Sequence, residues 1–366
     1  MAYYFLTASK DATVYLQQPN QNTGLDEILE VSKVYYGNVK DVSHALLKFD
    51  VGFLSQSLYN GTIGMTDARL LLKESQTEEI PLEYTIYANP ISGSWEMGIG
   101  TRFDTITTKG VTWNYREGDT KLNWLDNDFN SYTTASINDG SGGTWWTQYS
   151  ASQNFNYERG DIDMDVKPML KLWMTGSLNG GIPNDGLMLK FANSTLFPEN
   201  IESNTQDYGI LRLFSKETFT IYQPKVRIGW DDQSFITGSL SALTSNDIKV
   251  GVKSFKSEYK KNSIPKIRVV GRELYPVKTF TNSFAYSDVK YLPQTTYYQI
   301  KDFGSDDIIV PFSEYSKVSC DSDGNYINLN LSNWESGRVY KLEFKVDMDG
   351  DVKYYDDKIT FTISNN

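Results

Sequence analysis

The sequence of 366 residues contains a single cysteine, Cys320, and a single histidine, His44. One cysteine excludes an internal disulfide framework and is typical of a protein that folds in a reducing compartment. One histidine excludes a multi-histidine metal site, and the two residues together leave too few ligands for an ordinary zinc site. The sequence also lacks the run of roughly 20 apolar residues that a membrane span needs, and its first residues lack the features of a secretory signal. We therefore expect synthesis in a cytoplasm.

The net charge of −11 is unevenly distributed. Residues 234–366 hold 17 basic and 17 acidic side chains, so the whole net charge falls in residues 1–233. An acidic first part does not attract nucleic acid through a general electrostatic field. The change in charge predicts two domains, 1–232 and 248–366, joined by a linker at 233–247 that lacks strong periodicity.

The composition favours an all-β fold. Aromatic residues reach 14%, with 25 tyrosines, and short alternating apolar runs are separated by Gly, Asn, Pro and Ser. About nine such runs before residue 232, with one short helix near 161–177, predict a β-sandwich or jelly roll. In that helix Pro168 suits the first turn and Gly176 suits the exit. Six or seven further runs with turns about every 8–12 residues predict an immunoglobulin-like sandwich at 248–366.

Short motifs spread over residues 8–230 resemble the DNRLRE (disaggregatase-related) family of jelly-roll domains. They are "DATVYLQQPNQNTG", "LEVS", "HALLKFD", "ARLLL", "SWEMG", "VTWNY", "DMDVKPMLKLW", "IPNDGLMLK" and "LFSKET" with "QPKVRI". His44 stands where the family usually has Arg, and the polar insertion at 97–158 is longer than we expect for the family.

With its C-terminal β domain, which contains "YYQIKDFGSDDIIVPF", the chain also resembles virion structural proteins of tailed, myovirus-type phages. The resemblance implies a jelly roll and a non-enzymatic structural role in a phage virion. The place in the particle stays open between the tail, the neck or collar, and a decoration of the particle surface.

Asp161, Asp163 and Asp165 are candidate metal ligands. Their period of two places three carboxylates on one face of a strand, where they would hold a hard cation such as Ca²⁺, the one cofactor that the sequence suggests. The alternative is a solvated strand face followed by a helix cap. The stretches "CDSDGNY" and "DMDGD" have Gly at the fourth position counted from their first Asp, unlike an EF-hand loop, and are predicted to be hairpin turns.

Trp145 and Trp146 are candidates for a flat platform that stacks against a sugar ring. Neighbouring residues of a strand point to opposite faces, so at most one of the two rings can be exposed. The alternative is that the long insertion packs on its own aromatic side chains. A carbohydrate-binding module that engages host surface glycan is accordingly the second hypothesis for function.

Enzymatic activity is not expected. With one histidine and one cysteine, the remaining option is carboxylate chemistry, as in glycoside hydrolysis by an Asp/Glu pair. The 46 acidic residues nominate no particular pair. A polysaccharide-degrading enzyme is therefore the third hypothesis.

A basic stretch at 249–278 has nine basic and two acidic side chains, a local charge of about +7. Such a stretch can orient an acidic neighbour in an assembly, and we predict an assembly contact with other virion proteins or with further copies in a symmetric array. The alternative is a solvated edge strand protected by lysines. The basic residues are Lys249, Lys253, Lys256, Lys260, Lys261, Lys266, Arg268, Arg272 and Lys278.

Overall fold

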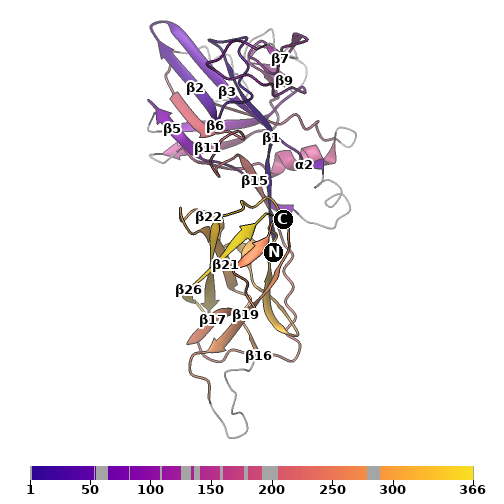
Figure 1. Ribbon diagram of the computed structural model, residues 1–366, viewed down its shortest axis with the longest axis vertical. Coiled ribbons are helices and arrows are strands. Elements are labelled where there is room, and N and C mark those ends of the chain that lie inside the picture. The colour runs from indigo at the N-terminus through magenta and orange to yellow at the C-terminus, as the bar shows by residue number, and fades with distance from the viewer. Residues whose placement is uncertain are drawn as a thin grey trace. The chain divides into compact units, whose positions relative to one another are not determined.

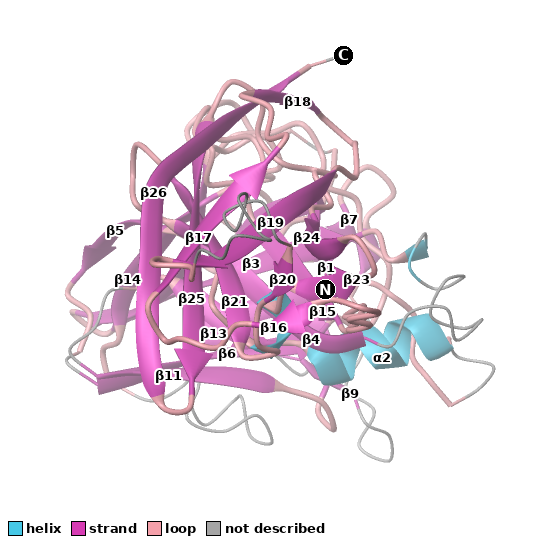
Figure 2. Cartoon of the chain, turned by 90° about the horizontal axis from the view of Figure 1, so that it is seen from below, coloured by secondary structure: helices cyan, strands magenta, loops and turns pink. Residues whose placement is uncertain are grey.

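The computed structural model describes residues 2–52, 54, 65–81, 83–107, 109–124, 133–135, 141–156, 160–176, 180–191, 205–277 and 289–365. Strands make up most of this part of the chain, and the helix α2 (Lys167–Thr175) stands out among them (Figure 2). The prediction of an all-β sandwich protein is confirmed. No helix within the described ranges is long and apolar enough to cross a membrane.

The chain divides into two compact units. The first unit comprises Leu6–Thr62 and Asp67–Arg227, and the second unit comprises Met1–Phe5, Ile63–Thr66 and Ile228–Asn366. The change from one unit to the other thus comes between Arg227 and Ile228, a little before the linker expected at 233–247, and the first residues belong with the C-terminal part. Separate folding of 1–232 and 248–366 stays a prediction.

The larger sheet of the first unit has the strand order β11-β6-β13-β3-β1-β15-β4-β12, and β2, β14 and β5 extend it from β3. The strand β3 pairs with β2 through residues 39–43 and with β13 through 45–47, so one long strand serves both parts of the sheet. The strands are β1 (Ala2–Tyr15), β2 (Ile28–Tyr36), β3 (Val39–Phe49), β4 (Met65–Leu72), β5 (Glu74–Glu78), β6 (Glu83–Pro90), β11 (Ala151–Asn156), β12 (Ile162–Asp165), β13 (Leu187–Phe191), β14 (Gly209–Phe214) and β15 (Lys225–Trp230).

The long polar insertion forms an aromatic core of its own against β1 and β3. It also contains the short strands β7 (Tyr115–Glu117), β8 (Leu122–Asn123), β9 (Thr133–Ala135) and β10 (Thr144–Trp146). The sequence places its tryptophans among Gly, Asn and Thr, which cannot themselves fill a core. The rings therefore bury one another and the neighbouring apolar face of the sheet. The buried members of this core are Ala12, Val14, Val42, Leu46, Ile91, Trp95, Val111, Trp113, Trp124, Trp145 and Met188.

The helix α2 has the ends that the sequence predicts. Pro168 lies in its first turn, and Gly176 follows its last residue with a φ of 69°, a conformation that glycine adopts readily. The backbone N–H of Lys167 donates to the Asp165 carboxylate over 3.0 Å. The helix buries Met169, Leu170 and Trp173.

The second unit is a sandwich of two sheets (Figure 1). One sheet has the order β16-β20-β19-β24-β23, with β17 on β19, and the other has the order β18-β26-β25-β21-β22. The strands are β16 (Ser241–Ala242), β17 (Ile248–Lys253), β18 (Glu258–Lys260), β19 (Lys266–Glu273), β20 (Lys290–Tyr291), β21 (Thr296–Asp302), β22 (Ile308–Val310), β23 (Ser319–Asp321), β24 (Gly324–Asn328), β25 (Val339–Met348) and β26 (Asp351–Ser364).

The arrangement of these sheets is that of an immunoglobulin-like sandwich. Four successive strands, β17-β19-β24-β23, form one layer and β26-β25-β21 form the other, as the A-B-E-D and G-F-C strands do in that fold. Near the start of β25, the hydroxyl of Tyr340 donates to the backbone oxygen of Glu335 over 3.0 Å, which is the tyrosine corner of such domains. The immunoglobulin-like prediction is therefore confirmed.

Residues near the start of the sequence help to form the core of the second unit. Tyr3 and Phe5 are only 3% and 5% exposed. The hydroxyls of Tyr3 and Ser313 are 2.7 Å apart, and the Asn333 side-chain amide donates to the Phe5 oxygen over 2.6 Å. The Phe5 ring packs edge-on against Trp334, with the centroids 5.9 Å apart. More than 300 residues therefore separate parts of the chain that share this core.

Candidate functional site

The basic side chains of the stretch lie on both sheets of the second unit, on β17 and β19 of one sheet and on β18 of the other. Together they are called here the basic surface. In β17 the alternation buries Ile248 and Val250 and exposes Lys249 and Lys253. In β19 the same alternation buries Ile267 and Val269 and turns the intervening basic side chains outward. The basic surface consists of Lys249, Lys253, Lys256, Lys260, Lys261, Lys266, Arg268 and Arg272. Lys278 lies outside the described residues.

Like charges oppose each other across the strands of this surface. The antiparallel register places Lys249 opposite Arg272 and Lys253 opposite Arg268. Directly opposed like charges destabilise a sheet. At Lys253 this repulsion is reduced, because Arg268 is itself paired with Asp321 and Asp323.

One end of the basic surface is neutralised within the unit. Lys266 Nζ lies 2.6 Å from a carboxylate oxygen of Asp321, and an Arg268 nitrogen lies 2.5 Å from the other. A second Arg268 nitrogen lies 3.4 Å from Asp323. The hydrogen bond from Arg268 is the largest effect on Asp321 and lowers the pKa of its carboxyl. These carboxylates hold two of the basic side chains in place.

The remaining lysines lack such carboxylate partners. Within the described part of the chain, Lys249, Lys253, Lys256, Lys260 and Lys261 have no carboxylate within 4.0 Å. All of them are exposed except Lys261, which is half-buried. The positive charge available to a partner is therefore concentrated on β17, on β18 and in the segment between them.

Each of the three candidate metal ligands bonds to another group of the protein. Lys73 Nζ lies 2.9 Å from Asp161, Arg69 forms an ion pair with Asp163, and Asp165 accepts the helix bond described above. Asp163 and Asp165 project from the exposed face of β12, in accordance with the solvated-strand alternative. The described residues contain no group of three His, Cys, Asp or Glu side chains that could hold a metal ion.

The structure corrects the prediction that Trp145 could stack against a sugar ring. Trp145 is fully buried in the core of the insertion, and Lys190 Nζ lies 3.4 Å from its ring centroid. Trp146, on the opposite face of β10, is half-buried. Adjacent rings in an aromatic-rich insertion fill its core before they reach solvent, so the alternative of internal packing describes Trp145.

His44 and Cys320 both have buried positions. His44 Nδ1 lies 2.8 Å from the Gly142 oxygen, and its ring packs on Trp113 with the centroids 5.1 Å apart. Cys320 is fully buried, and burial raises the pKa of its thiol. A raised pKa disfavours the thiolate, the form that acts as a nucleophile.

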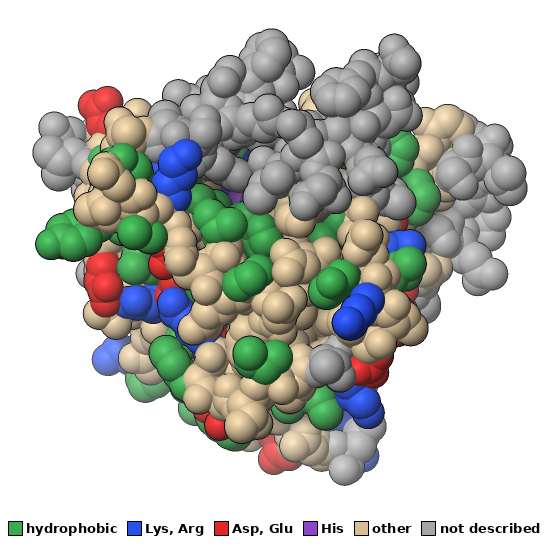
Figure 3. All heavy atoms as spheres, turned by 90° about the horizontal axis from the view of Figure 1, so that it is seen from above, with side chains coloured by type: hydrophobic (Ala, Val, Ile, Leu, Met, Phe, Trp, Pro, Cys, Tyr) green, Lys and Arg blue, Asp and Glu red, His purple; other side chains and the backbone are tan. Residues whose placement is uncertain are grey.

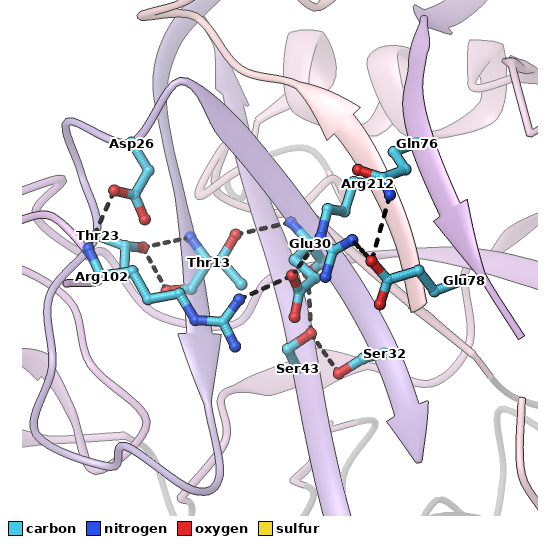
Figure 4. Close-up of polar contacts among 10 residues, drawn as sticks. All are labelled: Thr13, Thr23, Asp26, Glu30, Ser32, Ser43, Gln76, Glu78, Arg102 and Arg212. Atoms are coloured by element: carbon cyan, nitrogen blue, oxygen red, sulfur yellow. Dashed lines mark hydrogen bonds and ion pairs between the residues drawn. The ribbon is translucent and has the colours of Figure 1, made fainter. Parts of the chain in front are cut away.

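A polar cluster around the buried Glu30 in the first unit, with Gln76 and Glu78 exposed at its edge, was not predicted from the sequence (Figure 4). The carboxylate of Glu30, 3% exposed, accepts from Arg102 over 2.9 Å and from Arg212 over 3.0 Å. Figure 4 shows the two guanidinium groups reaching Glu30 from different sides. The group called here the Glu30 cluster consists of Thr13, Thr23, Asp26, Glu30, Ser32, Ser43, Gln76, Glu78, Arg102 and Arg212.

Residues far apart in the sequence build this cluster. Glu30 lies on β2 and Arg212 lies opposite it on β14, whereas Arg102 comes from the insertion. Arg212 also bonds to Glu78 over 2.5 Å. The hydroxyls of Ser32 and Ser43 are 2.8 Å apart, and Ser43 also donates to the Glu30 backbone oxygen over 3.1 Å. The only signal in the sequence was the polar alternation of "EILEVS", which does not identify the partners.

Two carboxyls, one in the cluster and one beside it, have raised pKa values. Burial raises the pKa of Asp26, and a hydrogen bond from the backbone N–H of Arg102 opposes this effect. Burial also raises the pKa of Asp41 on β3, and the neighbouring Glu30 carboxylate raises it further, whereas Arg102 lowers it. Burial is thus a larger effect on both carboxyls than the neighbouring charges are.

The face of the molecule in Figure 3 has no single apolar patch among its coloured side chains. Hydrophobic side chains are spread between polar groups and backbone, and acidic and basic side chains lie at its rim. Scattered apolar side chains are ordinary on a protein surface. This face therefore gives no reason to expect a hydrophobic docking site.

Comparisons with known proteins add little to this description. No family model matches the chain, and no curated protein matches it. Among solved structures the chain is similar to a DUF4785 family protein from Legionella pneumophila, with 10% sequence identity and a TM-score of 0.21. That comparison covers 100% of this chain and 68% of the other. A similarity at this level supports no conclusion about function.

Proposed function

We propose that this chain is a non-enzymatic structural component of a tailed-phage virion and acts through protein–protein contacts. The family resemblance of residues 8–230 supports the virion setting. The presence of two β-sandwich units supports a structural role, because closely packed β modules provide rigid surfaces for symmetric assemblies.

The observation that carries the proposal is the basic surface. Its five lysines without a carboxylate neighbour are concentrated in one short part of the second unit. An acidic partner surface would attract these lysines and orient the chain in the particle.

Charge reversal tests the proposal. Lys253, Lys256, Lys260 and Lys261 are changed together to Glu, and incorporation into particles is measured by quantitative mass spectrometry of purified virions. Exposed charges contribute about 0–1 kcal/mol each, so we expect folding to be nearly intact and incorporation to be lost. The matched control reverses Lys109, Lys121, Lys171 and Lys358, which are exposed, lie outside the basic stretch and, within the described part of the chain, form no ion pair.

Normal copy number in the charge-reversed particles would identify the lysines as a solvated edge and contradict the assembly contact. The glycan-binding hypothesis loses one of its two candidate residues, since Trp145 is buried, whereas Trp146 is half-buried. Hydrolytic activity on host polysaccharide remains unexpected. Release of reducing ends that disappears on changing a single Asp or Glu would overturn the structural proposal.

A further inference from the structure

Each unit has an edge strand that is hydrogen-bonded on one side only. In the first unit β5 pairs with β14, and in the second unit β17 pairs with β19. Among the described residues, no strand pairs with the other side of β5 or of β17. Residues 75–78 of β5 are exposed on both faces of the strand. An unpaired edge presents backbone N–H and C=O groups to which a strand of another chain can bond.

The charges of β5 are negative and regularly spaced. Glu74 and Glu78 are four residues apart and therefore lie on the same face of the strand, with Gln76 between them. Glu74 accepts from the Gly160 N–H over 2.7 Å and, within the described part of the chain, forms no ion pair. The hydrogen bond from Arg212 lowers the pKa of the Glu78 carboxyl, so Glu78 is ionised at neutral pH.

The charges of β17 are positive and have the same spacing. Lys249 and Lys253 are also four residues apart, on the exposed face of the strand, with Gly251 between them. When β5 of one copy lies beside β17 of another with Gln76 opposite Gly251, each lysine lies opposite a glutamate. This holds whether the two strands run parallel or antiparallel. Opposite charges that face each other across two strands stabilise their pairing.

Two identical edges do not match in this way. Two copies of β17 paired antiparallel around Gly251 place Lys249 opposite Lys253, and two copies of β5 paired around Gln76 place their glutamates opposite each other. Like charges in these positions destabilise a sheet. The complementary edges are therefore β5 and β17, which belong to different units of one chain. A second copy of the chain supplies the match without any further protein.

We propose that the partner of the basic surface is a second copy of this chain, whose β5 adds to the open edge of β17. The inference rests on the assembly role proposed above and names the partner for that role. The contact joins the first unit of one copy to the second unit of the next. Such a head-to-tail contact closes into a ring or continues as an open array. A contact between two short strands is weak alone and is strengthened when many copies are held together.

Disulfide trapping between two purified full-length variants tests the contact. Gln76→Cys and Gly251→Cys are mixed in a glutathione redox buffer, and intact mass spectrometry separates the mixed dimer from the two symmetric ones. Cys320 is fully buried, so the native thiol does not compete. A Cβ at Gly251 meets only a carboxylate oxygen of Asp357 at 3.9 Å, so the substitution fits. We expect the mixed disulfide to dominate, because facing residues have Cα atoms about 4.5–5.5 Å apart, within the range of a disulfide.

Thr77→Cys is the matched control. Thr77 is exposed on the same strand as Gln76 but points to the opposite face. Its mixed disulfide with Gly251→Cys should form at least about tenfold more slowly, because the two sulfur atoms then lie on different sides of the sheet.

Charge exchange gives a second readout of the same contact. The changes Lys249→Glu and Lys253→Glu in one partner should slow trapping about tenfold, because like charges then face each other. The additional changes Glu74→Lys and Glu78→Lys in the other partner should restore the rate, because opposite charges face each other again.

Equal trapping of Gln76→Cys and Thr77→Cys would overturn the pairing, and so would a mixed disulfide that is no more abundant than the symmetric ones. Both results would identify β5 and β17 as solvated edges that their charges protect from pairing. The cysteine variants keep the charges, so they test the contact even if a charge-reversed chain fails to fold. Incorporation is measured in virions and trapping on the purified chain. Loss of incorporation without trapping would leave the structural role and overturn only the second copy as partner.

Discussion

The two units use different interiors to stabilise β-sandwiches. The first unit buries Asp11, Glu30, Lys33 and Lys190, each no more than 2% exposed. In the second unit the charged side chain buried to this degree, among the described residues, is Asp302, which pairs with Arg338 over 2.8 Å. It lies in a unit whose large apolar core consists of aliphatic and aromatic side chains. Buried charges stabilise a fold only when their partners stay in place, whereas apolar burial is non-directional. We therefore expect the first unit to respond more strongly to pH and to changes in single polar groups.

The stability of the second unit depends on its apolar core. Its interior is regular, yet Tyr3 and Phe5 come from the opposite end of the sequence. An apolar core tolerates pH changes but loses stability when part of it is removed. The stability of the first unit therefore depends on its buried polar partners. The stability of the second unit depends on the strand that carries Tyr3 and Phe5.

The largest effect is expected from deletion of residues 1–5. The deletion removes the Tyr3 and Phe5 side chains from the second unit and leaves the Asn333 amide without its acceptor. Truncation of one buried aromatic residue costs about 3–5 kcal/mol. We expect strong loss of hydrogen-exchange protection in β25 and β26, with Phe219→Ala as the control. Unchanged protection would show that these residues are not part of that core.

The next effect concerns the Glu30 cluster. Glu30→Ala leaves Arg102 and Arg212 without their shared carboxylate. Removing one partner of a buried ion pair costs about 3–5 kcal/mol. Glu96→Ala is the control, because its ion pair with Lys10 is exposed and should contribute about 0–1 kcal/mol. Equal losses in urea unfolding for the two variants would contradict the importance of burial.

The pH response of the first unit should come partly from Asp11. Burial raises the pKa of its carboxyl from 3.8 to about 7. The folded state then holds this proton more tightly than the unfolded chain, so the stabilising contribution is complete below pH 4 and is lost as pH rises toward 7. Asp11→Asn should therefore gain stability relative to the unchanged chain over this range, by at most about 4 kcal/mol. A difference in unfolding free energy that does not vary between pH 4 and 8 would exclude this group.

The smallest effect is expected on the basic surface. Lys253→Thr removes a cation opposite Arg268, whose charge is already countered by Asp321 and Asp323, and should stabilise the second unit by no more than about 0.5 kcal/mol at low salt. The gain should shrink with added salt. Lys260→Thr, opposite Ser364 rather than a cation, is the control. A loss of stability in Lys253→Thr would show that this lysine is retained for folding.

The sequence predicted the elements better than their partners. Alternation identifies β19 and β25, and Pro168 with Gly176 marks both ends of α2. These signals are local. The place of Tyr3 and Phe5 in the second unit was missed, because strand pairing over such a distance leaves no periodic signal in one sequence.

The candidate sites show the same limit. The basic stretch and its edge position follow from composition and alternation. The carboxylates that neutralise Lys266 and Arg268 lie on β23 and in the turn that follows, so their effect requires the register of the sheet. The Glu30 cluster depends on three distant segments, and burial of Trp145 depends on the packing of the insertion.

Cryo-EM of the intact particle tests the central claim most directly. The account predicts density for both β-sandwich units at a fixed, repeated position, with Lys253 and Lys256 against an acidic surface of another protein chain. Absence of the chain from the particle, or a basic surface that faces only solvent, would contradict it.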